Sequence, residues 1–150
     1  MLGARRRCTV AAVSLGVSWM FFHGYVAALL WTRGDGFMRS GAPAVAETYY
    51  RRALAIDEDS HDALDRLFLV AIEQKKQADL DASILAGDRY LARHPNAVEI
   101  RMDRALAMFV ARRNESAARE FSWLANRLRD ERLGKFASLA RRRASAGDRT

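Results

Sequence analysis

The stretch Ala46-Glu47-Thr48-Tyr49-Tyr50-Arg51-Arg52-Ala53-Leu54-Ala55-Ile56-Asp57-Glu58 sets the register in which the rest of the chain is interpreted. Small and aromatic residues recur along it at Ala46, Tyr50 and Ala53, a spacing that predicts one buried face of an amphipathic helix. The acidic pair Asp57 and Glu58 marks the end of that helix. We interpret the stretch as the second helix of a helical hairpin.

Composition indicates helix along nearly the whole chain. The 150 residues include only two prolines and nine glycines, while alanine, leucine, arginine and acidic residues dominate. These residues favour helices, and runs of Val, Ile and Thr that would favour strands are few. After an apolar N-terminal segment, about 115 residues remain, enough for one domain with a core of modest size. The predicted fold class is all-α.

The positive charge is concentrated at the two ends of the chain. The formal net charge is +7, yet from Asp35 onward 21 basic residues face 18 acidic ones, and most of that excess follows Arg127. No groove-reading helix or base-stacking aromatic pattern accompanies the arginines, so no nucleic-acid partner is expected. The basic tail is interpreted as a solvated face, with contact to acidic lipid as the sharper alternative.

Residues 8–31 form an uncharged apolar segment, CTVAAVSLGVSWMFFHGYVAALLW. A helix of 24 residues is about 36 Å long, which suffices to cross a hydrocarbon core with some tilt. The basic flank 1–7 would stay in the cytoplasm, and Trp31 would lie at the membrane interface. A cleavable signal peptide is the competing interpretation. The length of the run and the lack of a small-x-small cleavage site favour an uncleaved anchor.

Polar and small residues within this segment predict contacts between membrane helices. Ser14, Gly16 and Ser18 form a small-residue cluster suited to helix packing, and His23 is expected to bond to a neighbouring helix in a larger assembly. A proton relay or haem ligand is the alternative role for His23. The single cysteine, Cys8, is interpreted as an inert thiol, with palmitoylation as the alternative.

The residues around the opening stretch resemble a tetratricopeptide repeat, in which small, aromatic and alanine positions recur over about 34 residues. Gly41-Ala42-Pro43 fits the turn within such a hairpin, although Glu58 stands where the family has a proline. Gly34 and Gly36 are interpreted either as a hinge or as part of a helix leaving the membrane. In the second case Tyr50 and Ala53 would meet residues near Gly34 and Phe37. The matching residues are Gly34, Phe37, Ala46, Tyr50, Ala53 and Leu54.

Two further hairpins are predicted downstream. The second has a helix over 62–76 and another over 78–93 that stops before Pro95, about 37 residues after the first hairpin. Asn96 is expected to cap the third, with Glu99 reaching back. The apolar faces are Leu64, Leu67, Phe68 and Ala71, then Leu80, Ile84, Gly87 and Leu91, then Val98, Met102, Ala105, Leu106 and Phe109, and last Ala117, Phe121, Leu124, Ala125 and Leu128.

A final helix is expected to cap the stack, with Phe136, Leu139 and Ala140 facing inward and arginines facing solvent. The predicted organisation is a basic flank 1–7, a transmembrane helix 8–31, a capping helix 132–146 and a tail 147–150. Between them lie tetratricopeptide-like repeats over 32–131, in units of about 27–60, 61–97 and 98–131.

The sequence lacks the motifs of common catalytic sites. It contains no glycine-rich phosphate loop, nucleophile elbow or paired metal-ligand spacing, so no enzyme, cofactor or metal is expected. His61 and Asp65 are one helical turn apart and resemble a weak divalent-metal pair. An acidic helix N-terminus, favoured by the helix dipole, is the preferred interpretation.

The predicted function is a membrane-anchored protein-interaction module or scaffold. In the family that the sequence resembles, the first helix of each hairpin lines the inner wall of the stack and binds a partner segment. Acidic residues there would suit a basic partner, and core packing is the alternative role of the apolar ones. The groove candidates are Asp62, Asp65, Leu69, Ile72, Glu73, Glu99, Met102, Leu106 and Phe109.

The alternative function is a structural accessory subunit of a membrane complex, in which the transmembrane helix makes the main contacts. Either way the chain would cross the membrane once and bind protein partners. The expected location is a bacterial inner membrane, with the N-terminus cytoplasmic and the repeats periplasmic. A mitochondrial membrane is the alternative, because the arginine-rich N-terminus also resembles an import signal.

Overall fold

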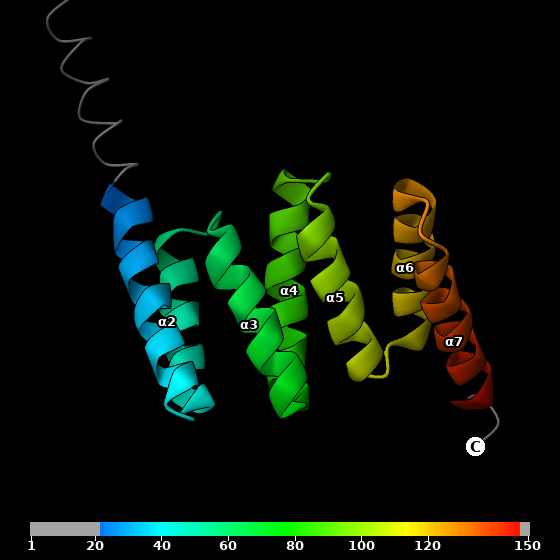
Figure 1. Ribbon diagram of the computed structural model, residues 1–150, viewed down its shortest axis with the longest axis horizontal. Coiled ribbons are helices and arrows are strands. Elements are labelled where there is room, and N and C mark those ends of the chain that lie inside the picture. The colour runs from blue at the N-terminus through cyan, green and yellow to red at the C-terminus, as the bar shows by residue number, and fades with distance from the viewer. Residues whose placement is uncertain (1–21, 148–150) are drawn as a thin grey trace, which may run out of the picture. The chain divides into compact units, whose positions relative to one another are not determined.

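The computed structural model describes residues 22–147, and this part of the chain is entirely helical, as predicted (Figure 1). Connections of two or three residues join the two helices of each hairpin, a length typical of antiparallel neighbours, and four residues join one hairpin to the next. The predicted helices 62–76, 78–93 and 132–146 begin and end within two residues of those observed. The helices are 22–39, α2 (Pro43–Ile56), α3 (His61–Gln74), α4 (Gln77–Arg93), α5 (Val98–Val110), α6 (Asn114–Leu128) and α7 (Glu131–Gly147).

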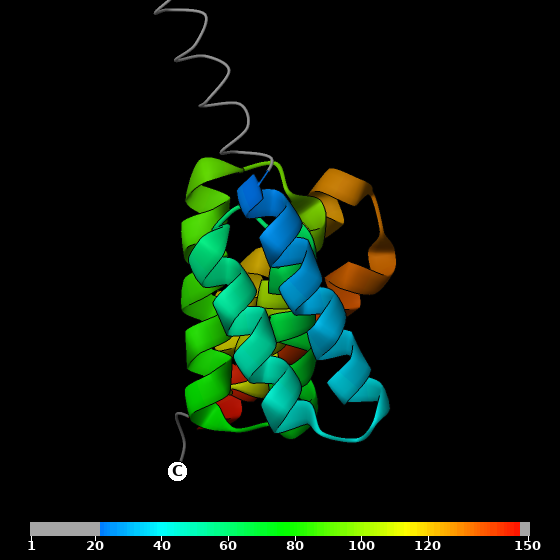
Figure 2. The ribbon, with the colours of Figure 1, turned by 90° about the vertical axis from the view of Figure 1, so that its left-hand side faces the viewer.

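The chain divides into two compact units, Met1–Ala63 and Leu64–Thr150. In the first unit, helix 22–39 and α2 form a hairpin, and Figure 2 shows them side by side. Helix 22–39 runs unbroken through Gly34 and Gly36, so the hinge interpretation is wrong. Gly41, whose φ is 76°, lies in the turn that follows this helix, and Pro43 begins α2. The predicted turn is therefore confirmed, because glycine adopts positive φ freely and proline suits a first helical position.

A ring occupies the space beside Gly34. A Cβ atom built on Gly34 would lie 2.5 Å from Cε1 of Tyr50, and the buried Tyr50 hydroxyl donates a hydrogen bond of 2.8 Å to Asp35 Oδ1. The predicted contact of Tyr50 with this part of the helix is confirmed. Phe37 stacks on Tyr49, with ring centroids 5.2 Å apart.

Ala53 packs nearer the start of helix 22–39 than predicted. It shares an apolar cluster with Ala27 and Ala63, against which Leu30 and Trp31 are partly buried. Trp31 is therefore partly buried within the first unit, and its predicted place at a membrane interface stays a prediction. Packing this side of the helix against α2 buries apolar surface.

The predicted anchor lies mostly beyond the described part of the chain. Residues 8–21, which include Ser14, Gly16 and Ser18, fall outside the described residues. Across residues 22–147, no helix combines the length and the apolar character that crossing a membrane requires. The described end of the predicted span, residues 22–31, belongs to helix 22–39.

The predicted faces of α3 and α4 are confirmed in full. All eight residues assigned to them are buried, and a Cβ atom on Gly87 would lie 2.7 Å from Cζ of Phe68. As in the first hairpin, an aromatic ring fills the volume that a glycine leaves empty. Here the glycine lies on the second helix and the ring on the first.

The turn between the two helices of each hairpin repeats a left-handed residue. Gly41, Lys75 and Arg112 have φ values of 76°, 55° and 61°, and they lie 34 and then 37 residues apart. The longer step coincides with a longer second helix, because α4 has 17 residues and α2 has 14. The predicted spacing of about 37 residues between the first and second hairpins is therefore wrong, because their turns lie 34 residues apart, and the 37-residue step falls between the second and third hairpins.

Three predictions for α5–α7 are wrong in detail. Ala97 is the N-cap of α5 and makes no side-chain capping bond, so Asn96 does not cap the helix. Leu128 is 46% exposed and Phe136 43% exposed. In α5 and α7, apolar residues lie on more than one side, and the helices bury the side that meets their neighbours. The buried residues there are Ile100, Ala105, Ala107 and Met108 in α5, and Leu133, Ala137 and Ala140 in α7.

Two arginines of α5 form ion pairs with the neighbouring helices α4 and α6. Arg104 contacts Asp88 of α4, and its Nη2 lies 2.6 Å from Oε1 of Glu120 in α6. Arg101 Nη1 lies 3.1 Å from Oε2 of the same carboxylate, and Arg101 Cζ lies 4.2 Å from the ring centroid of Trp123. Shared, partly buried pairs of this kind hold helices in register more firmly than isolated surface pairs.

Replacing Gly34 with alanine should destabilise the first hairpin. The new methyl group would overlap the ring of Tyr50, so we expect Gly34→Ala to lower the free energy of unfolding by about 2 kcal/mol. Gly36→Ala is the matched control, because nothing lies within 4 Å of its Cβ position. It should raise stability by about 0.5–1 kcal/mol through helix propensity. Denaturant unfolding followed by circular dichroism measures both, and equal effects would contradict the packing.

Replacing Lys75 with glycine should stabilise the second hairpin. Lys75 holds a positive φ that costs a side-chain-bearing residue free energy, so Lys75→Gly should raise the free energy of unfolding by about 0.5–1 kcal/mol. The adjacent Lys76 has φ −78° and ψ 125°, which any residue adopts. Lys76→Gly should therefore bring no gain in the same unfolding experiment, and a gain there would argue against relief of backbone strain.

Candidate protein-binding surface

The first helices of the second and third hairpins, α3 and α5, supply a mixed acidic and apolar surface. The 37-residue spacing of their turns places Leu69 and Leu106 at equivalent positions. We call Asp65, Leu69, Ile72, Met102, Asp103 and Leu106 the α3–α5 face. On α3 its members lie three or four residues apart, and on α5 the adjacent Met102 and Asp103 lie four and three residues before Leu106, so those of one helix share one side of it.

A pair of carboxyl groups joins the two helices. The pKa of Asp103 is raised to about 7. Burial is the largest cause, followed by the charge of Asp65, a hydrogen bond with the Asp65 side chain and the charge of Glu99. Asp65 Oδ2 also lies 3.9 Å from Arg66 Nη1, which is too far for a strong ion pair. At pH 7 the Asp103 carboxyl therefore holds a proton for about half of the time.

Apolar side chains continue the surface beyond this pair. Leu69 is 57% exposed although its neighbours Phe68 and Val70 are buried. Ile72, Met102 and Leu106 are half-buried. Core packing therefore does not account for Leu69, and the other three present only part of their surface to solvent.

The remaining groove candidates are placed differently. Asp62, Glu73 and Glu99 are exposed, and Asp62 belongs to the end of the first unit. Phe109 packs edge-on against Phe121, with centroids 6.4 Å apart, and Arg143 of α7 stands 4.4 Å from its ring centroid. Phe109 thus lies in the packing between α5, α6 and α7 and outside the α3–α5 face.

Asp103 is the functional candidate that the sequence did not single out. It follows Glu99 by one helical turn and precedes Leu106 by three residues, so its side was predictable from spacing. Its burial was not, because that depends on α3 packing beside α5. The mutual repulsion of Asp65, Glu99 and Asp103 is a property of the tertiary structure.

The first unit carries an apolar stripe of its own. Phe22, Tyr25 and Leu29 are exposed and recur on one side of helix 22–39, whereas Ala27 is buried against α2. His23, predicted to bond within a membrane assembly, is half-buried in the same helix. The stripe continues the uncharged segment of the sequence that precedes it.

Between residues 22 and 147, no three acidic, histidine or cysteine side chains gather in a geometry suited to a metal ion. Comparison with known proteins finds no family model and no curated protein that matches the sequence. The described part of the chain is all-helical, and its arrangement is compatible with a helical repeat.

Removing the charge of Asp103 should stabilise the protein at alkaline pH. With a pKa raised from 3.8 to about 7, the folded state holds a proton that the unfolded state has lost, so stability falls as pH rises from 4 to 7. Asp103→Asn removes that loss. After discounting for partial exposure, we expect a gain of about 1–2 kcal/mol at pH 8 and little change at pH 4.

The control for this experiment is Glu73→Gln, which neutralises an exposed carboxylate on α3. It should leave the pH dependence of unfolding unchanged. If Asp103→Asn and Glu73→Gln give parallel stability curves between pH 4 and pH 8, the pKa of Asp103 is not raised in the folded protein.

Proposed function

We propose that the chain is a membrane-anchored, tetratricopeptide-like interaction module that holds a basic, amphipathic segment of a partner protein on the α3–α5 face. The observation that carries the proposal is the exposed Leu69 next to the carboxyl pair of Asp65 and Asp103. We assign the chain no catalytic role, cofactor or nucleic-acid partner.

The repeat geometry supports a groove on this side. In stacked helical hairpins, the first helices line the inner wall, and α3 and α5 are the first helices here. The left-handed turn residues recur 34 and 37 residues apart, close to the period of the family that the sequence resembles. The tight glycine and aromatic contacts within the hairpins suit the same family.

The chemistry of the face specifies the partner. A lysine or arginine placed between Asp65 and Asp103 would stabilise the charged form of Asp103 and favour the release of its proton. Leu69, Met102 and Leu106 would cover apolar residues of the partner that lie one or two helical turns from its lysine or arginine. Binding and proton release are therefore linked, and affinity should rise as pH increases through 7.

The exposed stripe of Phe22, Tyr25 and Leu29 supports the anchor. Because Ala27 is buried against α2, the lipid-facing part of the predicted span would end at about Val26. Residues 8–26 number 19, or about 28 Å of helix, close to the thickness of a hydrocarbon core. A tether of this kind raises the local concentration of a membrane-bound partner. A bacterial inner membrane, with the repeats in the periplasm, is the proposed location, and a mitochondrial membrane is the alternative.

The same stripe also favours a second function. As an accessory subunit of a membrane complex, the chain would pack Phe22, Tyr25 and Leu29 against a neighbouring subunit, with His23 beside them. The two functions differ in which surface carries the partner.

Site-specific photocrosslinking in the membrane distinguishes them. A photoreactive residue at Leu69 should capture a partner peptide that carries lysine or arginine close to spaced apolar residues. Leu85 of α4 is the matched control, because it is a leucine of similar exposure, 52% against 57%. Capture at Leu29 with none at Leu69 would establish the accessory subunit in place of the groove.

Binding of the captured peptide to the full-length protein provides the quantitative test. Leu69→Glu should weaken binding about ten-fold or more, and Leu85→Glu less than two-fold. The affinity of the unmodified protein should fall several-fold from pH 8 to pH 6, and Asp103→Asn should abolish that dependence. Equal losses in the two leucine variants would overturn the proposed face.

A further inference from the structure

The last helix of the second unit, α7, leaves one side uncovered by the rest of the described chain. Lys135 and Arg142 are exposed, and Leu139 between them is half-buried. These three residues lie at i, i+4 and i+7, so they share one side of the helix, which we call the α7 outer side. The buried residues of α7 lie on another side and pack toward α6; they are Leu133, Ala137 and Ala140.

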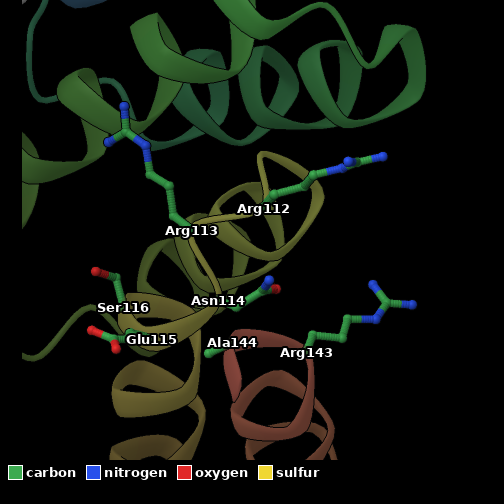
Figure 3. A pocket seen from close by; sticks show the side chains of 7 residues that line it. All are labelled: Arg112, Arg113, Asn114, Glu115, Ser116, Arg143 and Ala144. Atoms are coloured by element: carbon green, nitrogen blue, oxygen red, sulfur yellow. The ribbon is translucent and has the colours of Figure 1, made fainter. Parts of the chain in front are cut away.

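The two charges on the α7 outer side are available to a partner. Neither Lys135 nor Arg142 forms an ion pair with another of the described residues. Arg143, the next residue, is already engaged, because its Cζ lies 4.4 Å from the ring centroid of Phe109. Figure 3 shows Arg143 extending from α7 to the same side as Arg112, at the turn between α5 and α6. The α7 outer side is therefore distinct from the arginines at that turn.

At the α3–α5 face, α3 carries the complementary pattern. Asp65, Leu69 and Glu73 lie at i, i+4 and i+8, with Leu69 57% exposed between the two carboxylates. At 1.5 Å per residue these carboxylates are about 12 Å apart along the helix, and the two cations of the α7 outer side are about 10 Å apart. Each surface therefore places a leucine between two charges, and the charges of the two surfaces have opposite sign.

α5 strengthens this match. Asp103 hydrogen-bonds with Asp65, so a cation placed at that end would meet two carboxyl groups. Leu106 holds on α5 the position that Leu69 holds on α3, so the apolar middle is supplied by both helices. Opposite charges across an interface steer the encounter and fix its register, and the apolar contact between them excludes water.

α7 cannot cover the α3–α5 face of its own copy. Within the second unit, Leu64–Thr150, Figure 1 shows α4, α5 and α6 lying between α3 and α7. α7 is held on α6 by the rings of Phe136 and Phe121, with centroids 5.6 Å apart, and by Arg141, which donates a hydrogen bond of 2.6 Å to Ser122 Oγ. Bringing the two surfaces together within one copy would break this packing. They can meet only between copies.

We propose that the α7 outer side of one copy binds the α3–α5 face of a second copy, with Leu139 on Leu69 and the two cations beside the acidic residues. The inference rests on the proposed function, because it names a second copy as the source of the basic, amphipathic segment. The two surfaces differ, so the contact is heterologous and leaves one unused surface at each end of the pair. Copies would therefore assemble head to tail into a row.

The first test measures self-association of the full-length protein in a polyoxyethylene detergent, by sedimentation velocity of a fluorescently labelled copy. Leu69→Glu disables the α3–α5 face, and Lys135→Glu combined with Arg142→Glu disables the α7 outer side. Each variant alone should associate about ten-fold or more weakly than the unmodified protein. All three substitutions are at exposed positions, so the fold should be kept.

Mixing the two variants distinguishes a head-to-tail contact from a symmetric one. The Leu69→Glu copy keeps its α7 outer side, and the other copy keeps its α3–α5 face. An equimolar mixture should therefore restore one strong contact and stop at dimers, whereas the unmodified protein forms longer species. A mixture that associates as weakly as its components would overturn the proposal.

Matched controls carry the same substitutions elsewhere in the second unit. Leu85→Glu places the charge on a leucine of α4 that is 52% exposed, and Arg119→Glu with Arg127→Glu reverses two exposed cations of α6. Both should weaken association less than about two-fold. Losses equal to those of the test variants would reduce the effect to diffuse charge and leave no place for the two surfaces.

Cysteine crosslinking tests which residues meet. In a Cys8→Ala background, a copy with Leu69→Cys and a copy with Leu139→Cys should form a disulfide-linked pair on oxidation, because a disulfide needs the two Cα atoms within about 7 Å. Leu85→Cys should not link to Leu139→Cys. Equal linkage at positions 69 and 85 would contradict the contact.

The outcomes separate this inference from the proposed function. If unmodified copies do not associate while the α3–α5 face binds a basic peptide captured from another protein, the second copy is ruled out and the proposed function stands. If the face binds neither, both fall. Association that occurs only in nanodiscs containing phosphatidylglycerol, and that persists in Leu69→Glu, would assign the α7 outer side to a lipid surface and overturn the inference.

Discussion

The close approach of two helices at a glycine is the constraint on which each of the first two hairpins depends. Tyr50 fills the side-chain volume of Gly34, and Phe68 fills that of Gly87. In the first hairpin the glycine lies on the first helix and the ring on the second, and in the second hairpin these places are reversed. Packing therefore requires that the glycine and the ring together fill the space between the helices, whichever helix carries each. A missing Cβ atom on one helix lets a whole ring be buried on the other. That contact sets the distance between the helices and allows turns of two or three residues.

The exposed part of α3 follows from the same contact. Leu64, Leu67, Phe68 and Ala71 share the buried side of α3, and Leu69 lies about 100° beyond Phe68, away from the middle of that side. Leu69 is therefore turned to solvent, and Asp65, one turn earlier, lies on the same side. The packing that closes the hairpin thus determines which apolar residue of α3 stays exposed.

Periodicity predicted the elements and the faces of α3 and α4, because each has a single apolar side. It failed on α5 and α7, where apolar residues occupy more than one side and only the neighbouring helices decide between them. Met108 is buried and Met102 is not, although either would suit a core. All but one of the residues of the α3–α5 face were groove candidates from the sequence: Asp65, Leu69, Ile72, Met102 and Leu106. Asp103 was missed because its environment depends on a residue 38 positions earlier in the chain, Asp65.

Net charge also proved a poor guide to local chemistry. The chain carries +7, yet α5 separates its charges, with Arg101 and Arg104 directed toward Glu120 and Asp103 directed toward Asp65. The first group is neutralised inside the stack, and the second leaves an acidic surface on a basic protein. The side of α5 that carries Asp103 is therefore the one that would attract the basic partner segment of the proposed function, because Arg101 and Arg104 are already paired on another side of the helix.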